Sequence, residues 1–145
     1  MENQRLFYEC KTARVYYYIK LKALFLEYTS KVKSDAEFIE INSEVLKAFQ
    51  QLDCNQFVAD IRRMGVISVA SQQWIVKNLI PGLMKHLKGK PLFHAQLLDP
   101  VEVFAKVSAK NIKTKSAQEI PGFIVEQFYD TASLENYLSR HQMSA

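Results

Sequence analysis

The spacing of apolar side chains changes several times along this chain of 145 residues, and the order of those changes limits the folds that it can adopt. Apolar residues first alternate with polar ones, which is the period of a strand with one buried face. Further along they recur at steps of three and four, as in an amphipathic helix, and short apolar runs separate the helical stretches. We therefore expect leading strands, then repeated helix–strand units and a closing helix.

The leading strands are predicted between residues 6 and 32. Residues 14–21 and 24–29 each alternate between apolar and polar side chains. The two stretches follow each other directly, which favours antiparallel pairing. Residues 6–10 would add a third strand to this pair.

The first helix is predicted to begin at Ser34. Glu37 follows at the spacing by which a hydroxyl and a carboxylate each bind a free backbone N–H at a helix start. Apolar residues then recur at helical spacing as far as Leu52. The mostly apolar run 57–61 that follows predicts a strand buried on both faces.

A second helix is predicted from Ser68 or Ser71 to Lys88. Pro81 lies within it, removes one backbone hydrogen bond and should kink it. Gly89 is placed to end it, because glycine adopts the left-handed conformation of a helix terminus without a steric penalty.

The last third of the chain carries the strongest local signal, the sequence Asp99-Pro100-Val101-Glu102. It combines a cap, a proline at the first helical position and a carboxylate three residues after the cap, which predicts a short helix to about Val107. The lysine-rich residues 108–118 form either a loop or another short helix. Asp130 or Thr131 is expected to cap the last helix. Two apolar runs predict further strands, 92–98 and 123–129.

This order predicts a single α/β domain over residues 1–145. Alternating helices and strands need crossover connections, which make the later strands parallel and place helices against the sheet. We expect a mixed sheet of about five strands, with an antiparallel leading hairpin, parallel later strands and about four helices. A hydrophobic content of 48% is sufficient for one core.

Several kinds of chemistry lack the residues that they need. The four glycines form neither of the phosphate-binding loop motifs, and the three histidines have no paired ligand spacing, so we expect no cofactor, no metal and no enzymatic activity. Cys10 and Cys54 are expected to be free thiols. No secretory signal and no membrane-spanning run is evident, which makes the cytoplasm the expected location.

The most suggestive segment runs from the end of one predicted strand into the next helix. Ligands and partners of open α/β sheets usually bind at such strand ends. Two arginines there could hold an anion, and two serines offer hydroxyl groups. The candidate contact residues for a partner or ligand are Asp60, Arg62, Arg63, Ser68, Ser71 and Trp74.

Other interpretations of these residues remain open. The serines could simply cap the helix, and Trp74 could be a core residue. Asp60, Arg62 and His94 could also meet near strand ends as part of an unrecognised enzyme site. The net charge of +4 permits binding of nucleic acid through the lysine-rich residues 106–115, although no nucleic-acid motif is present.

The segment from residue 57 to residue 74 resembles the STAS/SpoIIAA-like domains, in particular a divergent bacterial branch. The resemblance covers residues 14–141 and depends on short motifs. These are Asp60-x-Arg62-x-Met64, Gly65-Val66-Ile67-Ser68, Gln72-Gln73-Trp74, Asn78-Leu79-Ile80-Pro81 and Asp99-Pro100-Val101-Glu102-Val103-Phe104.

The resemblance implies a regulatory module that binds another protein, with phosphorylation of a serine at the helix start controlling binding. Ser68 or Ser71 would be that serine. This chain has Ser68-Val69-Ala70-Ser71 where the switching members have Asp-Ser-Ser-Gly, so the glycine is missing. A related branch binds lipids or other small apolar ligands between helices and sheet, which is the alternative function. A homodimer is compatible with either function.

Overall fold

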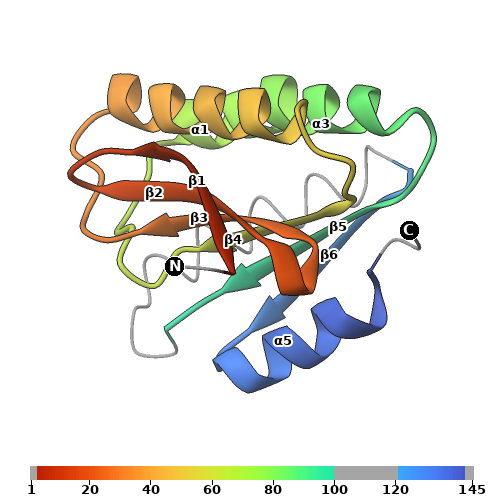
Figure 1. Ribbon diagram of the computed structural model, residues 1–145. Helices are drawn as coiled ribbons and strands as arrows, with labels where there is room; N and C mark the ends of the chain where they lie inside the picture. Colours follow the sequence, from red (N-terminus) through yellow and green to blue (C-terminus); the bar gives the residue numbers. More distant parts are fainter. Residues whose placement is uncertain (1–2, 100–120, 143–145) are drawn as a thin grey trace.

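The computed structural model describes residues 3–99 and 121–142, and a six-stranded mixed sheet lies at its centre (Figure 1). The strands lie side by side in chain order: β1 (Gln4–Glu9), β2 (Ala13–Tyr18), β3 (Ala23–Tyr28), β4 (Gln56–Asp60), β5 (Leu92–Leu97) and β6 (Phe123–Phe128). The first three are antiparallel, and β3 to β6 are parallel. The predicted α/β class with its mixed sheet is confirmed, with six strands where about five were expected.

Helices cover both faces of this sheet. The described helical elements are α1 (Asp35–Phe49), α2 (Val69–Trp74), the π-helical segment η2 (Ile75–Leu79), α3 (Ile80–Leu87) and α5 (Thr131–Arg140). Figure 1 shows α1 and α3 on one face and α5 on the opposite face. The helices predicted after Ser34, from Ser68 to Lys88, and after Asp130 are confirmed.

The strand predicted for residues 14–21 is shorter than expected. β2 ends at Tyr18, and Ile19–Leu21 form one turn of 3-10 helix. Tyr18 pairs directly with Ala23 in the antiparallel ladder, so the intervening residues must reverse the chain. The reversal includes Lys22, which has a positive φ of 52°. The alternation of apolar residues continues into this turn, which is why the sequence pattern extended the strand.

α1 begins as its sequence predicts. The Ser34 hydroxyl accepts a hydrogen bond from the Glu37 N–H at 3.1 Å. The Glu37 carboxylate in turn accepts one from the Lys33 N–H at 3.0 Å. The buried side of the helix then packs on the sheet through Ile41 and Phe49.

The long second helix is interrupted differently from the prediction. Pro81 stands in the first turn of α3, and the π-helical segment η2 immediately precedes it. Because proline has no N–H to donate to the carbonyl four residues earlier, regular α-helical bonding cannot continue through this point. At the other end, Lys88 takes the left-handed conformation with φ 51°, and Gly89 follows with φ 95°.

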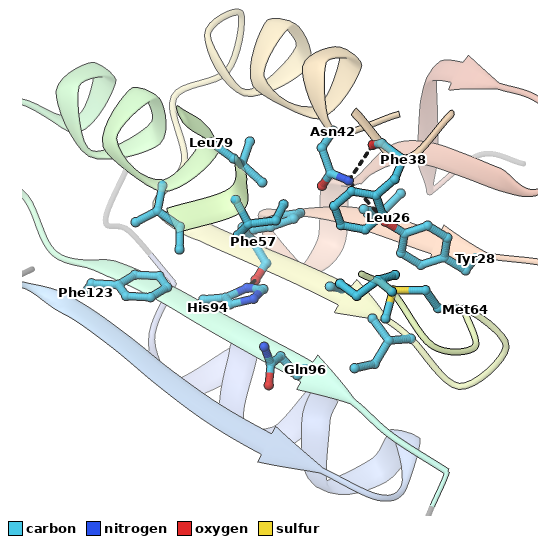
Figure 2. Close-up of a pocket in the computed structure, with 15 residues that line it drawn as sticks. Leu26, Tyr28, Phe38, Asn42, Phe57, Met64, Leu79, His94, Gln96 and Phe123 are labelled. Carbon is cyan, nitrogen blue, oxygen red and sulfur yellow. Dashed lines mark hydrogen bonds between the residues drawn. The ribbon is translucent and has the colours of Figure 1, made fainter. Parts of the chain in front are cut away.

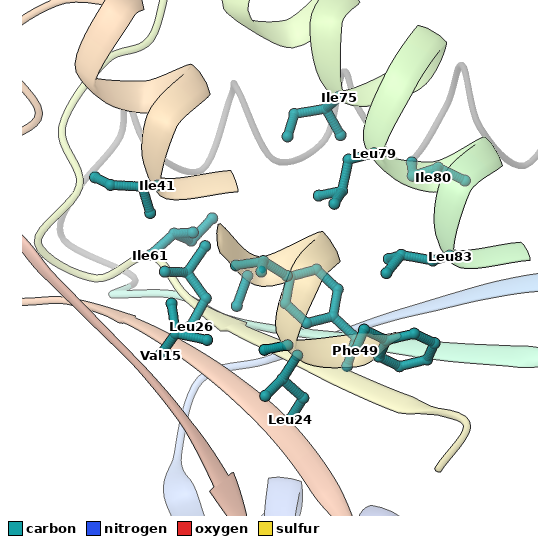
Figure 3. Packing of buried hydrophobic residues seen from close by; sticks show 14 of the residues in the cluster. Val15, Leu24, Leu26, Ile41, Phe49, Ile61, Ile75, Leu79, Ile80 and Leu83 are labelled. Carbon is teal, nitrogen blue, oxygen red and sulfur yellow. The ribbon is translucent and has the colours of Figure 1, made fainter. Parts of the chain in front are cut away.

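The sheet divides the apolar core into two parts. The larger part lies under α1, α2 and α3, and Figure 3 shows Leu24 and Leu26 of β3 facing Phe49 and Leu79 there. The smaller part lies under α5 and is formed mainly by Val58, Ala95, Leu134, Tyr137 and Leu138 with neighbouring β2 and β3 side chains.

The helix predicted from Asp99, the segment 108–118 and the lysine-rich residues 106–115 fall largely or wholly outside the described residues. Within residues 3–99 and 121–142, no helix has the length and apolar content that crossing a membrane requires.

Candidate functional site

The candidate residues lie close together in the sequence, but the sheet separates their side chains. Side chains alternate along β4, so Asp60 faces the α5 side while its neighbours Ala59 and Ile61 face α1 and η2. Ser68 and Ser71 lie on the α1 side. The sequence therefore predicted one contact site where the structure has two separate groups of side chains.

The first group is an ion pair at the end of β4. Arg62 donates from Nε and Nη2 to the two carboxylate oxygens of Asp60, at 2.9 and 2.8 Å. The hydrogen bond to Asp60 raises the pKa of Arg62 further above its ordinary value. Because Asp60 is buried and uses both oxygens, this arginine is held in place, and its free capacity to bind an anion is reduced.

This ion pair borders a depression of about 140 Å³ on the α5 side. Tyr16 and Tyr18 line one wall, and Glu27 and Glu135 add negative charge. The residues that line the depression include three carboxylates, Glu27, Asp60 and Glu135, and one cation, Arg62. The depression is therefore less suited to anions than the two adjacent arginines suggested.

The second group joins the starts of α1 and α2. Ser68 caps α2, since its hydroxyl accepts a hydrogen bond from the Ser71 N–H at 3.0 Å. Both serine hydroxyls donate to Oδ1 of Asp35, each at 2.6 Å. These bonds lower the pKa of Asp35, first through Ser68 and then through Ser71. The capping role predicted for Ser68 is confirmed, and Asp35 is a partner that the sequence did not reveal.

The surface around this group is partly apolar. Val66 and Val69, on either side of Ser68, are 59% and 63% exposed. A depression of about 210 Å³ lies between Val66 and Lys33, with the Ser68 and Asp35 side chains in its lining. We call Lys33, Asp35, Val66, Ser68 and Val69 the α1–α2 edge.

The remaining candidates take different roles. Arg63 is exposed in the loop after β4. Trp74 is half-buried and packs against the larger core cluster, in agreement with its interpretation as a core residue. Ser71 is buried, so Ser68 is the accessible one of the two serines.

A separate cavity lies inside the larger core, between the sheet and the helices α1, η2 and α3. Its volume is about 40 Å³. Figure 2 shows Phe57, His94 and Phe123 along its sheet side, with Leu79 opposite and Asn42 on α1. Sequence reasoning could not locate this space, because it depends on how large side chains from seven helices and strands pack together.

Among the described residues, no group of histidine, cysteine, aspartate and glutamate side chains could hold a metal ion. Comparisons of the chain with protein-family models, with curated proteins and with solved structures found no match. The resemblance to STAS/SpoIIAA-like domains therefore stays a prediction.

Proposed function

We propose that this protein is a non-enzymatic regulatory domain that binds another protein in the cytoplasm through the α1–α2 edge. The observation that carries the proposal is the pair of exposed valines, Val66 and Val69, on both sides of a hydroxyl group that joins two helix starts. Protein contact surfaces combine such an apolar centre with a polar rim.

Basic residues support this assignment and indicate the chemistry of the partner. Lys31, Lys33 and Arg63 are exposed in the two loops that lead into the edge. These loops touch each other, since the Val32 N–H donates to the Met64 carbonyl at 3.2 Å. These cations favour a partner surface that has carboxylates around an apolar patch. The attraction between the opposite charges would increase the rate of association at low salt.

Ser68 would regulate the contact if it were phosphorylated. A phosphate adds about −1.5 to −2 charges, and here it would meet the Asp35 carboxylate that now accepts the Ser68 hydroxyl at 2.6 Å. Repulsion between the two anions would break the Ser68–Asp35 hydrogen bond, one of the two that join the starts of α1 and α2. The modified edge would then present a different charge and shape to the partner.

The proposal is tested by capture of partners from lysate of the source cells on the immobilised domain. Val69→Asp should lose a protein that the wild type retains, because a charge at the centre of the contact costs desolvation. Ile124→Asp is the matched control, since Ile124 is also exposed but stands at the start of β6, away from the edge. A partner lost equally by both variants, or retained by Val69→Asp, contradicts the proposal.

Two substitutions of Ser68 separate charge from helix capping. Asparagine and aspartate both cap helices well, but only aspartate adds a negative charge. Ser68→Asp should therefore weaken partner binding, and Ser68→Asn should leave most of it. Equal binding by the two variants, measured by titration with the captured partner, would exclude control through charge at this position.

A further inference from the structure

The cavity in the larger core is lined in part by polar side chains, and some of their atoms have no hydrogen-bond partner within residues 3–99 and 121–142. Its lining is mostly apolar, yet it includes Asn42, His94 and Gln96, whose exposed fractions are 2%, 5% and 2%. A buried polar group without a partner costs about 1–3 kcal/mol. Such groups around an internal space indicate that something polar belongs there.

His94 offers a hydrogen-bond acceptor to this space. Its Nδ1 lies 2.9 Å from the carbonyl oxygen of Phe57, and a carbonyl can only accept, so Nδ1 carries the proton. Burial lowers the pKa of His94 to about 4, so the ring is neutral at pH 7 and Nε2 has a free lone pair. Within residues 3–99 and 121–142, Nε2 has no hydrogen-bond partner.

Gln96 offers the matching donor. Its Oε1 accepts a hydrogen bond from the Gln127 amide at 3.1 Å, which fixes the orientation of the Gln96 side chain. The Nε2 group then points away from Gln127, and Figure 2 shows it directed toward the side where His94 lies. No partner for this NH₂ group occurs in the described part of the chain.

Asn42 closes the polar lining from the helix side. Its Nδ2 donates to the Tyr28 hydroxyl at 3.2 Å and to the Phe38 carbonyl at 2.9 Å (Figure 2). Both donors are therefore used, and Oδ1, which has no hydrogen-bond partner among the described residues, remains as a second acceptor. The cavity thus presents acceptors on two sides and one donor, all neutral.

We propose that this cavity binds a small neutral molecule that carries one hydroxyl group on an apolar body. The hydroxyl would donate to His94 Nε2 and accept from Gln96 Nε2. These residues stand two positions apart on β5, so their Cα atoms are about 7 Å apart and one oxygen can reach both side chains. The rings of Phe57 and Phe123, which stack on His94 with centroids 4.8 and 5.9 Å away, would surround the apolar body.

The size of the cavity limits the ligand. About 40 Å³ holds a few atoms, and a single water needs about 10–15 Å³ in such a space. A ring-sized ligand therefore needs Ile75 and Leu79 to move outward. Both belong to η2, where the π-helical bonding replaces the regular helix, and π-helical turns are frequent at functional sites.

The test compares phenol with benzene, two probes that differ only in the hydroxyl group, by NMR titration of the ¹⁵N-labelled protein at pH 7. Phenol should cause saturable shifts at Ile75, Leu79 and the Gln96 side-chain amide. Benzene should bind about thirtyfold more weakly, since two hydrogen bonds of about 1 kcal/mol each are missing.

Two glutamine variants provide the controls. Gln96→Leu should reduce the preference for phenol, because only the hydrogen bond to His94 remains, whereas Gln73→Leu, on the exposed side of α2, should retain it. Even if Gln96→Leu folds poorly, the comparison of phenol with benzene on the wild-type protein shows whether the cavity recognises the hydroxyl group. Equal affinity for both probes, or no saturable shift from either because the cavity takes up water only, overturns the proposal.

Discussion

His94 lies in an environment that opposes its protonation. It is stacked between the rings of Phe57 and Phe123, and its one hydrogen bond uses the proton already present on Nδ1. Burial is the main cause of its lowered pKa. A second proton on the ring would place a positive charge in an apolar layer. The folded protein therefore binds this second proton only at low pH.

The stability of the protein should therefore fall as the pH drops from about 6.5 to about 4. In this range the unfolded chain binds a proton at the histidine and the folded chain does not, which favours unfolding. At about 1.4 kcal/mol for each pKa unit, the loss in the free energy of unfolding is about 3 kcal/mol. Urea denaturation at a series of pH values measures it.

His94→Phe is the control for this effect. The variant should have a flatter pH dependence between pH 6.5 and 4, whatever its absolute stability. Asp35 and Asp130, whose pKa values lie below 3.8, lose their stabilising contribution only at lower pH. An unchanged slope in the variant would show that another group causes the pH dependence.

The residues of the α1–α2 edge were predicted only in part. The Ser68 cap follows from local sequence, because a cap contacts its own helix within three residues. The bonds to Asp35 span more than thirty positions and depend on how α1 packs beside α2. No local pattern contains that information. The unpaired atoms of the core cavity were missed for the same reason.

At the scale of the helices, α1 and α3 are in close contact at Gly82. A Cβ atom added there would lie 2.9 Å from Cδ1 of Leu46 on α1, so the leucine would have to move. Gly82→Ala should destabilise the protein, because overpacking costs about 1–3 kcal/mol and the better helix propensity of alanine returns only about 1 kcal/mol. Thermal and urea denaturation measure the change.

Removal of the Leu46 side chain should abolish or reverse the destabilisation by Gly82→Ala. In the Leu46→Ala background, Gly82→Ala should become neutral or stabilising, because space is available and alanine favours the helix by about 1 kcal/mol. The double-mutant cycle should give a favourable coupling energy. Strict additivity of the two substitutions would show that the helices are not in close contact at this point.

The end of α3 provides another test. Lys88 has the left-handed φ of 51°, a conformation that costs a residue with a side chain roughly 1 kcal/mol compared with glycine. Lys88→Gly should therefore raise the melting temperature. Lys90→Gly, two positions later and outside the positive-φ residues, should not raise it. A loss of stability in Lys88→Gly would contradict the assignment of the helix end.

The boundaries of helices and strands were predicted well where they depend on neighbouring residues in the sequence. They were predicted poorly where they depend on contacts with residues far away in the sequence. The cap at Ser34 and the apolar stripe of α1 defined that helix from sequence alone. The early end of β2 was not predicted, since it depends on pairing with β3. Likewise, Pro81 indicated an interruption but not its π-helical form.

Across the whole molecule, the two core layers differ in size, and this should appear as a difference in local stability. The layer under α1, α2 and α3 contains many more buried residues than the layer under α5. We expect α5 to open at a lower free energy than α1 in native-state hydrogen exchange. Equal protection of both helices would show that the layers unfold together.

Leu138→Ala should lower the protection of α5 selectively. Leu138 is completely buried in the smaller layer, and such a truncation costs about 2–5 kcal/mol. Amides of α1 should change less than those of α5. A uniform loss of protection over all helices would count against separate opening of α5.

The strand order also has a consequence for how the chain folds as it leaves the ribosome. Because the strands lie in the sheet in the order of synthesis, each new strand finds its neighbour already made, and no strand has to enter between two others. Assembly can therefore proceed by addition at one growing margin, as domains generally fold from their N-terminal part during translation. Until the next strand arrives, that margin is open to pairing with other chains, and β4 and β5, with their apolar side chains, are the strands most at risk.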